Sequence, residues 1–116
     1  MTMIESAPST VAARMFRGFS DPRRVALLQA LLEGERRVAD LVEEVGGSQS
    51  NVSGHLACLK DCGLVVDRPG PRRQVFYRLS GPAVRDLLVA AECLLAANGQ
   101  AIELCTNPMM DGCCDG

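Results

Sequence analysis

Residues 38–59 of the chain read VADLVEEVGGSQSNVSGHLACL. In the first part, valine and leucine recur at i, i+3, i+4 and i+7 and stop at two glycines, which is the spacing of an amphipathic helix that ends in a tight turn. Ser48 is a preferred helix-capping residue and opens the second part, in which Val52, Leu56 and Leu59 fall on one side of a helix. Two short helices joined by a glycine turn predict a helix-turn-helix.

The flanking segments extend this motif. Helical spacing predicts a first helix over residues 8–19, and a second that begins after the capping residue Asp21 with a proline and runs to Gly34. Residues 64–68 and 74–79 have the composition of two strands, and the arginine-bearing loop between them predicts a β-hairpin, or wing. The sequence therefore predicts a mainly α fold with a small β-hairpin, a winged helix-turn-helix.

A last helix is expected to run to Asn98-Gly99, and its apolar residues cover more than one stripe. Such a surface predicts a homodimer formed through the terminal helices. The 116 residues fit one domain with an aliphatic core, because only 3% are aromatic and none is tryptophan. We expect a winged helix-turn-helix DNA-binding and dimerisation domain over residues 1–99 and a flexible, cysteine-containing tail over residues 100–116.

The charge is unevenly distributed along the chain. The total is −2, but residues 48–80 carry a net charge of +3 and residues 81–116 a net charge of −4. A local cationic face can attract phosphate, so the acidic total does not exclude nucleic acid as a partner. No cationic leader or long apolar run is present, so we expect a cytoplasmic protein with no membrane partner and with metal-binding or reduced cysteines.

The residues expected to contact double-stranded DNA lie at the start of the second motif helix and in the wing. Short polar groups there suit a recognition helix that enters the major groove, and wing arginines suit phosphate or the minor groove. The simpler alternative is a solvated helix face. His55 either touches DNA or is a packed histidine bonded within the motif, and Arg23 and Arg24 either reach phosphate or are solvated. The predicted DNA-binding residues are Ser48, Gln49, Ser50, Ser53, His55, Arg72 and Arg73.

Two of the six cysteines predict a metal site. Cys58 and Cys62 are four residues apart, so both thiols project from one side of the same helix and can share one ion. Thiolates select soft ions, although zinc also binds them. Two thiolates do not complete a site, so a further donor must come from elsewhere. Cys93 lies among leucines and is interpreted as a small hydrophobic residue.

Four segments together carry a resemblance to a known family: FSDPRRVALL at residues 19–28, SQSNVSGHLACL at 48–59, GLVV at 63–66 and QVFYRL at 74–79. With them, residues 14–98 resemble the ArsR/SmtB family of winged-helix, metal-responsive transcriptional repressors. The resemblance implies a homodimer that binds a palindromic operator and leaves it when an inducer binds. It also implies that the protein is not an enzyme.

Within that family, Cys58 and Cys62 with Cys105 resemble the ligand set of the cadmium- and lead-sensing branch. For Cys113 and Cys114 three roles stay open: extra or substitute donors, redox-active thiols, or no function. Other family sites have no counterpart, since no cysteine stands near residues 37–39 and the last helix has no histidine. The expected inducer is therefore a soft metal ion, cadmium or lead first, with arsenite, mercury or zinc as alternatives.

Three other functions compete with this hypothesis. A repressor of the same fold could sense oxidation of its thiols, or a metal-buffering module could keep the cysteines without binding DNA. A thiol enzyme could use Cys113 and Cys114, but a reactive thiolate favours basic neighbours and the flanking residues are Asp111 and Asp115. Metal titration under reducing conditions separates the first of these from a metal sensor.

Overall fold

The computed structural model describes residues 7–105 of the chain. They belong to two compact units, Met1–Ser80 and Gly81–Gly116. The sequence places a boundary after residue 99, whereas the contacts group the last helix with the segment that follows it. The predicted tail is described only as far as Cys105, so Cys113 and Cys114 lie outside the described residues.

The first unit contains the expected helices. In chain order they are α2 (Pro8–Phe16), the short 3₁₀ helix η1 (Arg17–Phe19), α3 (Pro22–Leu31), α4 (Val38–Val45) and α5 (Gln49–Asp61). The helix expected over residues 8–19 thus changes to 3₁₀ geometry for its last turn.

Both predicted helix caps are confirmed. Asp21 Oδ1 accepts hydrogen bonds from the backbone N–H groups of Arg23 at 2.8 Å and Arg24 at 3.3 Å. The Ser48 hydroxyl accepts one from Asn51 N–H at 3.1 Å. Each cap satisfies backbone donors that have no partner inside the helix, which fixes where α3 and α5 begin.

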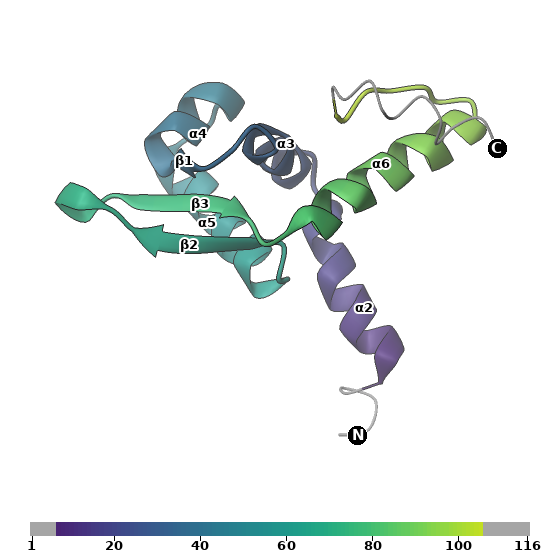
Figure 1. The fold of residues 1–116 in the computed structure, drawn as a ribbon, viewed down its shortest axis with the longest axis horizontal. Coiled ribbons are helices and arrows are strands. Elements are labelled where there is room, and N and C mark those ends of the chain that lie inside the picture. Colours follow the sequence, from purple (N-terminus) through teal and green to yellow (C-terminus); the bar gives the residue numbers. More distant parts are fainter. Residues whose placement is uncertain (1–6, 106–116) are drawn as a thin grey trace. The chain divides into compact units, whose positions relative to one another are not determined.

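The wing belongs to a three-stranded antiparallel sheet in the order β1-β3-β2. The strands are β1 (Arg36–Arg37), β2 (Val65–Pro69) and β3 (Val75–Leu79), and Asp67 pairs with Tyr77 across the hairpin. Figure 1 shows the β2–β3 hairpin extending beyond the helices of the motif. The sequence predicts β2 and β3 but not β1, because two residues are too few to show a strand period.

One ion pair and one ring contact hold the wing near its tip, where Arg68 pairs with Phe76 across the hairpin. The Arg68 guanidinium binds both carboxylate oxygens of Glu35, at 2.7 and 2.6 Å, and lies 4.6 Å from the centre of the Phe76 ring. Gly70 passes so close to that ring that a Cβ at this position would overlap it. The bidentate pair joins β2 to the residue just before β1, so the hairpin has a defined orientation on the first unit.

The core of the first unit is aliphatic, as the composition predicts. Its most buried side chains have 0 to 2% of their surface exposed and include Leu27, Leu28, Leu41, Leu56, Leu59 and Leu64. Gly18 of η1 is also buried, and a Cβ there would overlap Leu64 and lie 3.5 Å from the Cβ of Cys62. The 3₁₀ turn therefore packs directly on the C-terminal end of α5.

The second unit is built on α6 (Pro82–Ala97). The residues after it turn back alongside the helix (Figure 1), and the backbone N–H groups of Leu104 and Cys105 each donate a 2.6 Å hydrogen bond to Oε2 of Glu92. Within the described part of the chain, no helix is long and apolar enough to cross a membrane.

Candidate functional site

The N-terminal end of α5 presents the polar side chains that the sequence predicts. Gln49 and Ser50 are exposed, whereas Ser53 is half-buried. The Ser48 hydroxyl caps the helix and lies 3.4 Å from that of Ser50, so its bonding is partly used within the protein. The freest donors and acceptors on this surface are therefore those of Gln49 and Ser50.

A hollow of about 300 Å³ separates this end of α5 from the wing. It brings together Gln49 and Ser53 from the helix and Arg73 from the wing. Arg37 lies on its other side and forms a two-point ion pair with Asp40, at 3.0 and 3.1 Å. The lining residues are Arg37, Val38, Ala39, Gln49, Ser53, Arg73, Gln74, Val75 and Tyr77. The guanidinium of Arg73 beside the polar side chains of Gln49 and Ser53 makes this hollow suitable for phosphate, whereas the charge of Arg37 is already paired with Asp40.

Arg37 is not among the basic residues that the sequence indicates as phosphate contacts, which come from the wing and from the pair Arg23 and Arg24. The signal that could have found it is the basic pair Arg36-Arg37, which stands directly before the first helix of the motif.

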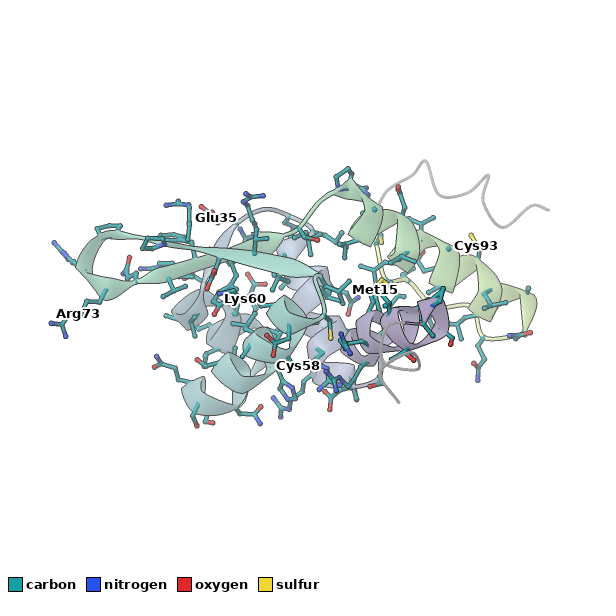
Figure 2. The ribbon with its side chains drawn as sticks, turned by 90° about the horizontal axis from the view of Figure 1, so that it is seen from below. Met15, Glu35, Cys58, Lys60, Arg73 and Cys93 are labelled. Carbon is teal, nitrogen blue, oxygen red and sulfur yellow. The ribbon has the colours of Figure 1, made fainter. Side chains whose placement is uncertain are left out.

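The wing tip holds its two arginines in an uncommon backbone conformation. Arg72 and Arg73 have φ values of 60° and 64°, in the left-handed region that residues other than glycine rarely adopt. Both side chains are exposed, and Figure 2 shows Arg73 at the end of the hairpin. Such a conformation costs of order 1–3 kcal/mol and is concentrated at functional sites. Here it holds two exposed cations at the tip of the wing.

His55 packs against the start of α3. Its ring is only 18% exposed, Nδ1 lies 3.5 Å from Nη1 of Arg24, and Nε2 lies 4.0 Å from Oδ1 of Asp21. These contacts favour the packed-histidine alternative, and a contact between His55 and DNA stays a prediction. His55 thus joins α5 to the N-terminal cap of α3.

The two arginines after Asp21 are also used within the unit. Arg24 Nη2 donates to the Arg17 carbonyl at 2.8 Å and to the Ser20 hydroxyl at 3.1 Å. Arg23 Nη1 donates to the Gly46 carbonyl in the turn of the motif at 3.0 Å. The start of α3 is consequently bonded to η1, to the turn and to α5.

The C-terminal end of α5 carries the predicted thiol pair. Cys58 is half-buried, Cys62 is 7% exposed, and both are free. Figure 2 shows Cys58 on α5, away from the tip of the wing. Burial raises the pKa of the Cys62 thiol, and the neighbouring Cys58, within hydrogen-bond contact, raises it further. The sulfurs are therefore placed to act on one ion.

Arg17 of η1 adds a cation to this pair. Its side chain contacts the Cys62 thiol and opposes the rise of the pKa that burial causes. The carbonyl of the same residue accepts the hydrogen bond from Arg24. No sequence spacing could have indicated Arg17, because its place depends on how η1 packs through Gly18.

The third predicted ligand lies in the second unit. Cys105 is free and 4% exposed; its burial and the charge of Glu92 raise the pKa of its thiol, and Arg85 opposes the shift. Cys93 of α6 is half-buried and disulfide-bonded, which departs from its interpretation as a free, small hydrophobic residue. Among residues 7–105 no group of three or more histidine, cysteine, aspartate or glutamate side chains is placed to hold a metal ion. Cys58 and Cys62 are a donor pair that still needs a partner.

The helix-turn-helix, the sheet that follows it and the exposed polar start of α5 define a winged helix-turn-helix DNA-binding protein. The model of the bacterial regulatory protein arsR family matches residues 21–66. The chain is 46% identical, over 99 residues, to the probable mercury resistance operon repressor of Streptomyces lividans, in a match that covers 85% of this chain and 78% of that protein. The chain therefore belongs to the arsR family and is a transcriptional repressor, and the family's members are regulators rather than enzymes.

Two solved structures extend the comparison. A homodimeric winged helix-turn-helix DNA-binding domain from Mycobacterium bovis is 32% identical with a TM-score of 0.68, and the match covers 79% of this chain and 89% of that one. The cadmium metal-sensor CmtR from Mycobacterium tuberculosis is 43% identical with a TM-score of 0.55, covering 65% of this chain and 78% of that one. The expected mainly α, winged helix-turn-helix fold is confirmed.

Proposed function

We propose that this repressor binds operator DNA as a homodimer and releases it when a soft metal ion binds Cys58 and Cys62. One observation carries the proposal: two neighbouring free thiols, Cys58 and Cys62, lie at one end of α5, and the other end presents Gln49 and Ser50. An ion bound by both sulfurs acts directly on the element that meets DNA.

The DNA-binding surface consists of the start of α5, the hollow beside it and the wing tip. Gln49, Ser50 and Ser53 are suited to base edges and phosphate, and Arg73 is suited to the backbone or the minor groove. Because phosphate contacts release counterions, binding weakens steeply with salt.

A homodimer is supported by apolar side chains exposed on the terminal helices. Val11 and Phe16 of α2 are 54% and 52% exposed, and Leu94 of α6 is 65% exposed. The M. bovis domain is itself homodimeric. A two-fold symmetric dimer would place two copies of α5 in successive major grooves of a palindromic site.

The bonds around η1 offer a route from the thiols to DNA. Arg17 contacts Cys62 through its side chain and Arg24 through its carbonyl, and Arg24 approaches His55 on α5. An ion that replaces Arg17 as the positive charge beside the sulfurs would release this arginine and shift η1 against α5. The coupling free energy needed between metal binding and DNA binding is modest, about 1–3 kcal/mol, which corresponds to a 5- to 150-fold change in DNA affinity.

Ligand chemistry limits the inducer to soft ions. The site has two thiols, with Cys105 as our first choice for the third donor, from the same or the partner subunit, and Cys113 or Cys114 as substitutes. Sulfur donors favour cadmium and lead, then arsenite and mercury, over hard ions such as magnesium. The mercury resistance repressor and the cadmium sensor among its relatives support this class of inducer. Zinc remains a comparison ion, since it also binds thiolates.

The test is a DNA-binding titration on the DNA upstream of the protein's own gene. Fully reduced protein is mixed with labelled DNA, and cadmium, lead, arsenite, mercury and zinc are added in turn to the wild type and to Cys58→Ser, Cys62→Ser and Cys105→Ser. We expect a soft ion to weaken wild-type binding at least about fivefold. The three variants should bind metal-free DNA as the wild type does and lose the response.

Two results would contradict the proposal. A doubly substituted Cys58→Ser, Cys62→Ser protein that still leaves DNA at the wild-type dose of every ion shows that the pair is not the sensor. Release by an oxidant alone, with no response to any ion under reducing conditions, identifies a thiol-oxidation sensor instead.

A further inference from the structure

Glu92 is the one buried charged or polar residue in the described part of the chain, with 5% of its surface exposed. It follows Val84 and Leu88 at intervals of four, so it lies on the buried side of α6, where an apolar residue would be expected. A carboxylate is costly to bury unless hydrogen bonds compensate it. Its place therefore needs a specific explanation.

The bonds of Glu92 provide that explanation. Oε2 accepts from Leu104 N–H and from Cys105 N–H, each at 2.6 Å, which is short even for a charge-assisted bond. Another bond in this segment, Gln100 N–H to the Leu95 carbonyl at 2.8 Å, only closes the end of the helix. Glu92 thus binds the backbone of Cys105 and of the residue before it.

We propose that Glu92 is the positioning residue that presents Cys105 as the third sulfur donor for the metal, an inference that rests on the function proposed above. A donor on a loose segment would have to be ordered each time an ion binds, at a cost in conformational entropy. A donor whose backbone is already bonded to a helix avoids that cost. Glu92 holds the donor rather than joining the ligands, because soft ions disfavour carboxylate oxygen.

The experiment counts sulfur ligands in the intact, reduced protein. Cadmium is titrated in, and the ultraviolet charge-transfer absorbance per bound cadmium is read for the wild type, Cys105→Ser, Glu92→Ala and Glu92→Gln. Cys105→Ser should lose about a third of the absorbance, since one sulfur of three is removed, and Glu92→Ala should lose as much. Glu92→Gln should keep it, because the amide oxygen still accepts both N–H bonds. Glu103→Ala, which removes an exposed carboxylate from the same segment, is the matched control.

The possible failures are distinguishable. Full absorbance in Glu92→Ala with a reduced value in Cys105→Ser overturns the role of Glu92 and leaves the proposed function intact. Full absorbance in Cys105→Ser shows that Cys105 is not a ligand. This result overturns the present inference and removes Cys105 from the proposed site, but it leaves Cys58 and Cys62 as the proposed ligands.

A second measurement does not depend on metal. Metal-free protein is alkylated briefly, and the modification of Cys105 and Cys62 is compared by peptide mass spectrometry, with DNA binding as the check that each variant is folded. Glu92→Ala should raise the alkylation of Cys105 several-fold and leave Cys62 unchanged. Glu92→Gln keeps the acceptor for both N–H groups and removes only the charge that raises the pKa of the Cys105 thiol, so it should raise the alkylation of Cys105 less than Glu92→Ala does. Equal rates in Glu92→Ala and the wild type would also overturn the proposal.

Discussion

The two ends of α5 differ in what surrounds them. At the N-terminal end, Gln49 and Ser50 are exposed, and the helix begins at a capping serine on the surface. At the C-terminal end, Leu59 and Cys62 are buried beneath η1, and Gly18 lies in direct contact with that end. One end is available to another molecule, whereas the other is held by the protein.

Under the function proposed above, this difference lets one helix both read DNA and respond to a ligand. The helix has 13 residues and is therefore about 20 Å long, and its backbone bonds make it move as a unit. A change in packing at the buried end is carried to the exposed end without refolding. A sensor placed at the exposed end would compete with DNA for the same side chains.

The largest expected effect comes from the buried side of α5. Leu56 is fully buried, so Leu56→Ala should lower the free energy of unfolding by about 2–5 kcal/mol through lost burial and the cavity that remains. Ser50→Ala, at an exposed position of the same helix, should change it by less than about 0.5 kcal/mol. Urea denaturation followed by circular dichroism measures both, and similar values would show that the two sides of the helix do not differ as described.

Substitutions at two glycines, one in η1 and one in α5, test the contact between these elements. A Cβ at Gly18 would overlap Leu64 and press on Leu59, so Gly18→Ala should cost about 1–3 kcal/mol of stability and weaken metal-induced release of DNA. A Cβ at Gly54, on the exposed side of α5, would meet no atom within 4 Å, so Gly54→Ala should raise stability by about 0.5–1 kcal/mol. Thermal melts and DNA titrations with and without cadmium compare them. An unchanged metal response in a folded Gly18→Ala protein would argue against coupling through η1.

A smaller effect is expected from single cations. Arg73→Ala removes one phosphate contact at the wing, so it should weaken DNA binding on all sequences alike and reduce the slope of log affinity against log salt by about 1. Lys60→Ala removes the same charge at the C-terminal end of α5, where Lys60 pairs with Asp67 at 3.1 Å, and should leave the slope unchanged. Equal slopes for both variants would place the wing tip outside the DNA interface.

Much of the fold was predictable because it depends on local signals. Helices α4 and α5 follow from a 3.6-residue period, two glycines and a capping serine, and the caps at Asp21 and Ser48 lie where the sequence predicts. Strand β1 could not be predicted, because its two residues become a strand only by pairing with β3. The 3₁₀ turn at η1 likewise depends on the packing of Gly18 against residues that are distant in the sequence, Leu59 and Leu64.

The candidate site was predictable to the extent that its members share one helix. Spacing alone places Cys58 beside Cys62, and the structure brings these thiols into contact. Arg17 reaches the pair from another element, so no spacing in the sequence could reveal it. Glu92 did leave a signal, as a charged residue in line with Val84 and Leu88, but its partners are backbone N–H groups that only the folded segment supplies.

The smallest expected effect concerns the junction between α3 and α5, where Asp21 approaches His55. Burial acts to raise the pKa of Asp21, but N–H bonds from Arg23 and Arg24 and the nearby charges outweigh it, so the pKa is lowered. A carboxylate with a lowered pKa stabilises the fold above its unfolded value, near 4, and that contribution disappears as the pH falls through the folded value. Asp21→Asn keeps a capping oxygen but does not titrate. Its melting temperature should therefore lie slightly below the wild-type value at pH 7, and the two should converge as the pH falls below about 4. A gap that stays constant over this range would show that the cap acts through hydrogen bonding alone, without the charge that links α3 to α5.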